Sequence, residues 1–207
     1  PQIRIAHLNW DEDEDIITAA TIEVIYAGWR GLCTFGLYDS KIPESMLLLL
    51  LRQHLSLTHV YTLQCLWAED TYEVNFPFPY PTNDTGSRLH TLCIYCDGAV
   101  TLKSIVACCP HLHTLYLSEP SFRTSSVPLE HTLHCLVGGR VQRLCLSHYR
   151  ELHDADLLQL QHSTIICLIL HHCQKFSSTG LTELVPSMPR LLELSVLRCS
   201  QIEPNMM

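Results

Sequence analysis

Apolar residues recur along this chain at three fixed positions, in the order apolar-x-x-apolar-x-apolar, and the pattern occurs eight times. The eight triplets are Ile5/Leu8/Trp10, Leu32/Phe35/Leu37, Val60/Leu63/Cys65, Leu89/Leu92/Ile94, Leu112/Leu115/Leu117, Val141/Leu144/Leu146, Ile165/Leu168/Leu170 and Leu191/Leu194/Val196. Successive triplets lie 27, 28, 29, 23, 29, 24 and 26 residues apart. Apolar residues that alternate with others over a few positions are typical of a short strand with one buried face. The pattern therefore predicts about eight short strands.

The segments between the triplets predict how these strands are joined. Residues 16–27, 46–51, 102–109, 129–137 and 181–185 have helical spacing of apolar residues, form an apolar run, or are bounded by prolines and glycines that end helices. A strand with its helix cannot bury its apolar side alone, so neighbouring repeats are expected to stack. This alternation predicts an α/β solenoid, a curved horseshoe with a parallel sheet on its concave side and helices or loops on its convex side.

One connecting segment, residues 68–88, departs from this alternation. It contains three alternating prolines in Phe76–Pro81, and alternating prolines exclude a helix and favour an extended path. Two interpretations are equally supported. The segment is either a packed loop whose aromatic residues cover the convex side, or a recognition loop, since long irregular loops in compact domains are often functional.

A cysteine follows two of the predicted strands at the same distance. Cys173 and Cys199 each lie three residues beyond the last apolar position of a triplet, and residues 178–184 between them read Ser-Thr-Gly-Leu-Thr-Glu-Leu. With a repeat length of roughly 20–29 residues, these features resemble the cysteine-containing subclass of leucine-rich repeats. That subclass is best known from the F-box substrate receptors of ubiquitin ligases, so the resemblance implies a binding protein. No F-box is visible here, and a repeat subunit of a larger assembly, mitochondrial complexes included, is the related alternative.

Composition narrows the class of protein further. We expect a single domain over residues 1–207, because the repeat runs from Ile5 to Val196 without a break. No apolar stretch approaches the roughly 20 residues of a membrane span. A net charge of −8 without a basic face argues against nucleic acid as a partner. The 11 cysteines fall mostly on predicted strands and helices, which favours reduced thiols in a cytoplasmic or nuclear protein, with a mitochondrial location as the alternative.

The many histidines and cysteines do not form a recognisable metal or catalytic motif. Cys93 and Cys96 make one short pair, but a structural zinc site needs a second pair that converges on the same point. The chain has no nucleophile elbow, no phosphate-binding glycine loop and no metalloprotease helix. We therefore expect no metal, no cofactor and no enzymatic activity.

Residues between the buried strand positions should point to the open face of the sheet. We predict a cluster of aromatic and apolar residues there, across the second to fifth repeats, because such residues on an open sheet match the chemistry of interface hot spots. The alternative is that residues 76–81 fold over this cluster and bury it. The predicted binding residues are Tyr38, Gln64, Leu66, Trp67, Tyr95, Tyr116, Arg143 and His171.

These features predict a protein-interaction module, similar to a substrate-recognition domain, that binds a protein partner through its concave sheet. Two alternatives stay open: a structural or scaffold subunit that uses its ends and convex side, and a carbohydrate- or small-ligand-binding protein. Solenoids normally need polar caps, and both ends of the repeat run are apolar. Self-association through uncapped ends is therefore a further expectation.

Overall fold

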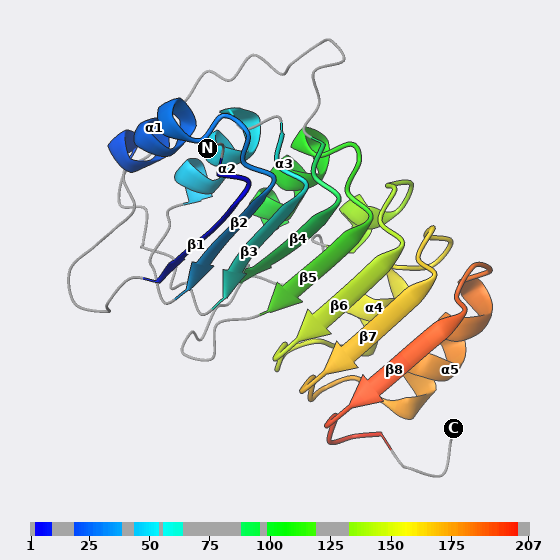
Figure 1. Cartoon of the computed structure of the whole chain (residues 1–207). Coiled ribbons are helices and arrows are strands. Elements are labelled where there is room, and N and C mark those ends of the chain that lie inside the picture. Colours follow the sequence, from blue (N-terminus) through cyan, green and yellow to red (C-terminus); the bar gives the residue numbers. More distant parts are fainter. Residues whose placement is uncertain are drawn as a thin grey trace. The chain divides into compact units, whose positions relative to one another are not determined.

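The computed structural model describes residues 3–9, 19–38, 44–53, 56–63, 88–95, 99–118 and 133–202. The described residues form eight strands, five α-helices and one short 3-10 helix, so the chain is an α/β protein. It divides into two compact units, residues 1–95 with 107–112 and residues 96–106 with 113–207. Within each unit the strands pair in parallel, in the order of the chain (Figure 1). The parallel α/β architecture is confirmed, and the single domain stays a prediction.

The first unit has a four-stranded sheet covered on one face by helices (Figure 1). Its strands are β1 (Ile5–Asn9), β2 (Thr34–Tyr38), β3 (His59–Leu63) and β4 (Thr91–Tyr95). Its helices are α1 (Ala19–Gly28) and α2 (Glu44–Gln53). The apolar run 46–51 lies within α2 as predicted, and Leu47, Leu50 and Leu51 are 0% exposed. No helix in the described part of the chain is long and apolar enough to cross a bilayer.

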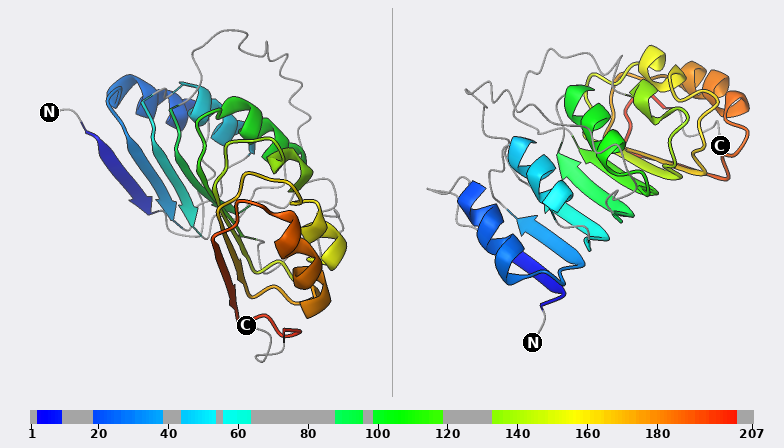
Figure 2. Two further views of the ribbon diagram at one scale, coloured as in Figure 1. Left: turned by 90° about the vertical axis from the view of Figure 1, so that its right-hand side faces the viewer. Right: turned by 90° about the horizontal axis from the view of Figure 1, so that it is seen from above.

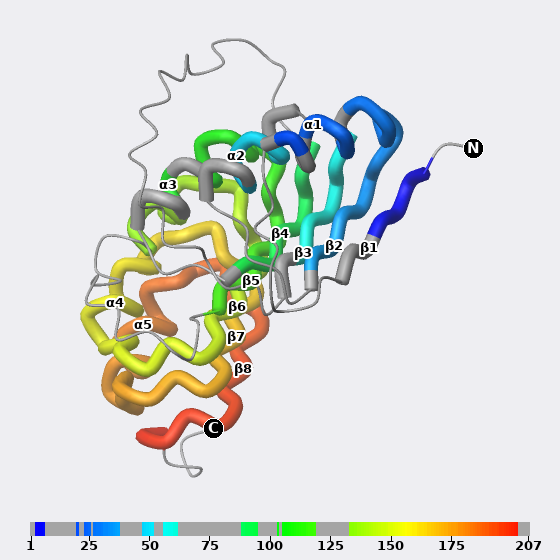
Figure 3. The backbone as a smooth tube through the Cα atoms, turned by 90° about the vertical axis from the view of Figure 1, so that its left-hand side faces the viewer, coloured from blue at the N-terminus to red at the C-terminus, as the bar shows by residue number. Residues whose placement is uncertain are grey.

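The second unit has the same arrangement of parallel strands and helical segments. Its strands are β5 (Thr114–Ser118), β6 (Arg143–Ser147), β7 (Cys167–His171) and β8 (Glu193–Leu197). Its helical segments are the first part of α3 (Ala99–Cys108), the 3-10 helix η2 (Leu133–Leu136), α4 (Asp154–Leu158) and α5 (Ser178–Ser187). Helices α4 and α5 cover one face of these strands (Figure 2) and lie side by side (Figure 3). The other face is open among the described residues.

The strand register confirms six of the eight predicted triplets and corrects two. Phe35 pairs with Ala6 and with Val60, so Ile3/Ala6/Leu8 and Leu57/Val60/Thr62 are the equivalent positions of β1 and β3. The predicted triplet that begins at Ile5 was therefore two residues too far along the chain, and the one that begins at Val60 was three residues too far. The shift arose because other apolar residues near each strand fit the same spacing, while Ala6 and Thr62 are poor matches to it.

Neighbouring repeats of the second unit are joined by the same hydrogen bonds. The N–H groups of Gln142 and Arg143 donate to the carbonyl of His113, at 2.8 and 3.0 Å. The pair Ile166 and Cys167 donates likewise to Gln142, and the pair Leu192 and Glu193 donates to Ile166. This recurrence holds each strand in one register against the strand before it.

Cys173 and Cys199, the two cysteines that follow strands at the same distance, connect neighbouring repeats in an equivalent way. The thiol of Cys173 lies 3.5 Å from the carbonyl oxygen of Leu146, and that of Cys199 lies 3.6 Å from the carbonyl oxygen of Leu170. Each thiol thus reaches a carbonyl of the preceding strand. The backbone carbonyl at this turn needs a hydrogen-bond partner, and the thiol is a small donor that fits there. This need explains why cysteine occurs at the same position of both repeats.

A side-chain network fixes α5 against the start of α4. Asp154 accepts hydrogen bonds from the N–H of Ser177 at 2.6 Å and from its hydroxyl at 2.7 Å. Ser177 is the N-cap of α5, and its hydroxyl oxygen accepts from the N–H of Gly180 at 3.2 Å. The helix predicted over 181–185 is thereby confirmed and begins earlier, while Pro186 lies within its last turn rather than after it.

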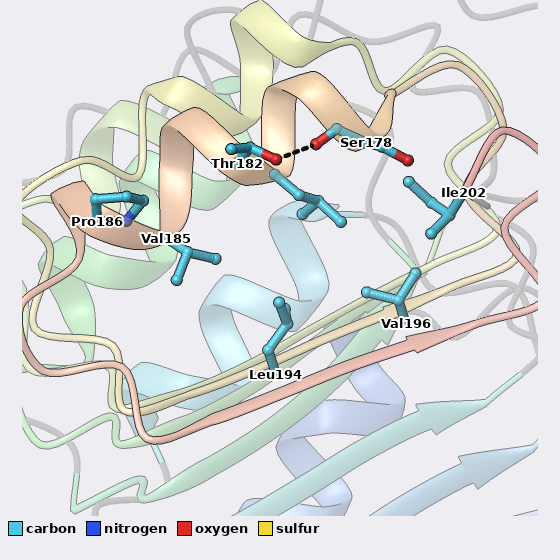
Figure 4. A pocket seen from close by; sticks show the side chains of 8 residues that line it. Ser178, Thr182, Val185, Pro186, Leu194, Val196 and Ile202 are labelled. Atoms are coloured by element: carbon cyan, nitrogen blue, oxygen red, sulfur yellow. Dashed lines mark hydrogen bonds between the residues drawn. The ribbon is translucent and has the colours of Figure 1, made fainter. Parts of the chain in front are cut away.

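An apolar groove of about 500 Å³ lies between α5 and β8. Figure 4 shows Val185 of α5 facing Leu194 and Val196 of β8, with Ile202 at the other side of the space. Val185, which lines the groove, is 40% exposed. The groove has the character expected for association through an apolar end, and self-association stays a prediction.

Candidate binding face

The uncovered face of β5–β8 carries three rows of side chains in register. We define it as the open face, and its rows are Thr114/Arg143/Cys167/Glu193, Tyr116/Cys145/Ile169/Ser195 and Ser118/Ser147/His171/Leu197. The residues between these rows are core, as shown by Leu115, Leu144 and Leu168, which are at most 1% exposed. The period-two alternation of the strands thus positions every candidate side chain.

The first row is held by an ion pair that passes over a thiol. The guanidinium of Arg143 on β6 lies 3.7 Å from the carboxylate of Glu193 on β8, and both side chains are about half exposed. Cys167, on the strand between them, is only 2% exposed although it belongs to the open face. A surface pair of this kind adds little to stability, but it orders a polar area beside the apolar middle row.

The middle row provides the apolar part of the open face. Tyr116, Cys145 and Ile169 are partly exposed and occupy adjacent strands, so their side chains form a continuous strip about two strand spacings, roughly 10 Å, wide. Burial raises the pKa of the Cys145 thiol to about 11. Cys145 is therefore a neutral contact residue rather than a nucleophile.

The carboxyl ends of the strands hold residues with unusual backbone geometry. His148, His172 and Arg198 directly follow β6, β7 and β8, and their φ angles are 63°, 54° and 55°. Such left-handed conformations are uncommon outside glycine. Backbone hydrogen bonds hold two of them in place, because the N–H of His148 donates to His171 at 2.8 Å and that of His172 donates to Leu197 at 2.9 Å.

These turns bring three imidazole rings together, and we call them, with Ser147 and Arg198, the histidine rim. The ring centroids of His148 and His172 are 4.9 Å apart and stacked, and that of His171 lies 5.6 Å from His148 and 4.4 Å from His172. The Ser147 hydroxyl lies 2.8 Å from Nδ1 of His148 and 3.2 Å from Nδ1 of His171. Burial, followed by neighbouring cationic groups, lowers the pKa of both His148 and His171.

The structure brings together three of the eight predicted binding residues, and the placement of the others differs. Tyr116, Arg143 and His171 all belong to the open face. In the first unit, the backbone of Tyr38 aligns with that of Leu63, and Tyr95 is the last residue of β4. The side chains of Tyr38 and Tyr95, and all of residues 64–87, lie outside the described part of the structure.

The prediction for the third repeat also needs a correction of register. Tyr61, not Gln64, shares a row with Gly36 and Cys93. Gln64, Leu66 and Trp67 come after Leu63, the last residue of β3, and lie outside the described residues, so their binding role stays a prediction. The sequence interpretation did not include the rim residues His148, His172 and Arg198 among the candidates. Their common signal is their place immediately after a strand in three successive repeats.

The described residues contain no group of three or more histidine, cysteine, aspartate or glutamate side chains arranged to hold a metal ion. The rings of the histidine rim are instead stacked or edge-on, with hydrogen bonds to Ser147 and Arg198. The absence of metal and of catalysis stays an expectation from the sequence.

Thiol reactivity should separate the cysteines by burial. The nine described cysteines are free thiols. Cys173 is 0% exposed, and burial raises its pKa to about 12. We expect Cys173 to resist iodoacetamide in the native protein at neutral pH, because neither access nor the thiolate is available. Labelling in denaturant without reductant, followed by mass spectrometry, should then modify all 11 cysteines. Rapid native labelling of Cys173, or cysteines that stay unmodified after unfolding, would contradict this expectation.

No protein-family model matches this chain, and no curated protein matches it in sequence.

Proposed function

We propose that this chain is a leucine-rich-repeat protein of the cysteine-containing subclass that binds a protein partner through the open face of its parallel sheet. Three features of the second unit support the repeat assignment. The strands recur in one register, each strand accepts the same backbone hydrogen bonds from the next, and Cys173 and Cys199 reach the carbonyls of the preceding repeat. Repeats of this kind form solenoids whose concave sheet is a binding surface.

The composition of the open face is the main observation that supports a binding role. An aromatic residue, an aliphatic residue and an arginine, Tyr116, Ile169 and Arg143, lie on neighbouring strands and are at least partly exposed. Tyrosine and arginine are the residue types that dominate binding energy at protein interfaces. The rigid strands under them fix their positions before a partner arrives, which reduces the entropy lost on binding.

The role is one of recognition without catalysis, similar to that of a substrate-recognition domain. The free thiols, with pKa values raised by burial at Cys145 and Cys173, support a protein of a reducing compartment, either cytoplasmic or nuclear, with a mitochondrial location as the alternative. A subunit role in a larger assembly would instead use the helices and the groove between α5 and β8.

A comparison of matched variants tests the proposal. Affinity capture from cell lysate, quantified by mass spectrometry, compares the parent chain with Tyr116→Ala/Arg143→Ala and with Thr182→Ala/Glu183→Ala on the exposed side of α5. Truncation of a hot-spot residue costs about 1–2 kcal/mol or more, so the first variant should lose its partner by about tenfold or more. The second variant should retain it.

Both variants should keep the circular dichroism spectrum and melting temperature of the parent chain, because all four residues are at least partly exposed. A partner that survives the open-face substitutions but is lost on the α5 substitutions would replace the recognition role with the subunit role.

A further inference from the structure

The histidine rim gathers basic groups, and no carboxylate among the described residues hydrogen-bonds or pairs with them. Arg198 lies 3.3 Å from Nε2 of His172, and the three rings are within contact of one another. The groups that act electrostatically on His148 and His171 are His172, Arg150, Arg198 and each other. Among the described residues, no carboxylate hydrogen-bonds or pairs with His148, His171, His172 or Arg198. This is notable in a chain whose net charge is −8.

One hydrogen bond of the rim requires an unprotonated ring nitrogen. Arg198 only donates, so Nε2 of His172 has to be the unprotonated acceptor of that contact. The Ser147 hydroxyl can donate to one of the two Nδ1 atoms beside it or accept from both, so its contacts allow neutral or charged rings. A proton on Nε2 of His172 would remove the acceptor from Arg198.

The backbone positions the same side chains at one edge. His148, His172 and Arg198 occupy equivalent left-handed positions after three successive strands, so their side chains emerge along a row at the carboxyl end of β6–β8. Left-handed conformations cost free energy for residues other than glycine and cluster at functional sites. The row continues the third row of the open face, where His171 and Ser147 lie.

We infer that the histidine rim binds an acidic segment of the protein partner, through its carboxylate groups, and takes up protons as it does so. This inference rests on the proposed function, because the rim borders the open face. It would bind the part of the partner that extends beyond the open face. Arg198 would change its acceptor from His172 to the anion, and the freed rings would become charged donors. Hydrogen bonds between such cations and an anion are stronger than those between neutral groups.

The pH dependence of binding follows from the same groups. In the free protein the pKa of His148 and of His171 is below the ordinary value of 6.5, because of burial and of the cations around them. An anion would offset both effects and raise these pKa values. Binding is then linked to proton uptake and strengthens as pH falls toward and through 6.5. Without an anion, the stability of the folded unit has the opposite pH dependence to anion binding. The unfolded chain binds more protons than the folded unit in this range, so the free energy of unfolding decreases as the pH falls.

Sulfate is a suitable probe, because it stays fully ionised across this range and needs no partner. The imidazole pKa values of isotope-labelled protein would be measured by NMR in sulfate and in chloride at equal ionic strength. We expect sulfate to raise the pKa of His148 and His171, and to bind about tenfold more tightly at about pH 5.5 than at about pH 7.5. Unchanged pKa values, or an affinity independent of pH, would overturn the inference.

Matched variants assign the effect to the rim. His172→Asn and Arg198→Asn remove rim side chains while asparagine tolerates the left-handed backbone. His162→Asn is the control, because His162 is exposed and also left-handed, with a φ of 60°, and makes no ring contact with the rim. The first two variants should weaken sulfate binding by about fivefold or more, and the control should not. Equal weakening by all three variants would contradict the site.

A hexaglutamate peptide, with hexaglutamine as its neutral counterpart, tests the ligand class. Hexaglutamate should displace sulfate at about pH 5.5 and hexaglutamine should not. If sulfate binds the rim but hexaglutamate does not compete, the acidic-segment assignment is wrong. If both anions bind the rim while the open-face substitutions do not reduce partner capture, the proposed function is wrong and the anion site is still supported. The two failures are therefore distinguishable.

Discussion

Replacing Leu168 with alanine should lower the free energy of unfolding of the second unit by about 2–5 kcal/mol. Leu168 is 0% exposed and belongs to β7, between β6 and β8, on the side of the sheet that faces the helices. Removal of three buried carbons loses their transfer free energy and leaves a cavity that rigid neighbouring strands cannot close. Urea denaturation followed by circular dichroism would measure the difference.

Leu192→Ala is the matched control for this prediction. Leu192 is the same residue type in the next repeat but is 86% exposed. Its truncation should change the free energy of unfolding by no more than about 0.5 kcal/mol. Similar losses for the two variants would mean that the assignment of the buried and exposed sides of the repeat is wrong.

Gly180→Ala should destabilise the protein by about 1–3 kcal/mol, although alanine favours helices over glycine by about 1 kcal/mol. A β-carbon at Gly180 would overlap the carboxylate of Asp154. That carboxylate cannot move aside cheaply, because it accepts two hydrogen bonds from Ser177, the N-cap of α5. The clash would therefore loosen the network that joins α4 to α5.

A double-mutant cycle tests the cause of this loss. With Asp154 changed to alanine there is no carboxylate to overlap, so Gly180→Ala should become neutral or stabilising in that background. Gly28→Ala serves as the control, because a β-carbon there meets no atom within 4 Å. A loss at Gly180 that persists without Asp154 would refute the steric explanation. Thermal denaturation of the five proteins would provide the comparison.

The sequence predicted the strands well where the apolar pattern had a single solution. From Leu89 onward every triplet lies in the register predicted, because leucine or another large apolar residue fills each buried position. The register of β1 and β3 was mistaken because Ala6 and Thr62, which align with Phe35 and Leu37 of β2, do not fit a triplet of large apolar residues. A small or polar residue at such a position weakens the only signal that sets the register.

The candidate site was predicted less completely, for reasons of backbone geometry. Tyr116, Arg143 and His171 follow from strand alternation alone, which a sequence displays directly. The left-handed turns at His148, His172 and Arg198 do not, since that conformation is uncommon for any residue other than glycine. Hydrogen bonds to the next repeat hold the turns at His148 and His172, so tertiary structure as well as local sequence creates the rim.

The most direct test of the central claim is a carbene footprint of the second unit with and without a captured partner. Binding through the open face predicts that labelling of Tyr116, Ile169 and His171 falls when the partner is present. Labelling of Val185 and Pro186, which line the groove between α5 and β8, should not change. Protection of Val185 and Pro186 with unchanged labelling of the open face would contradict the account.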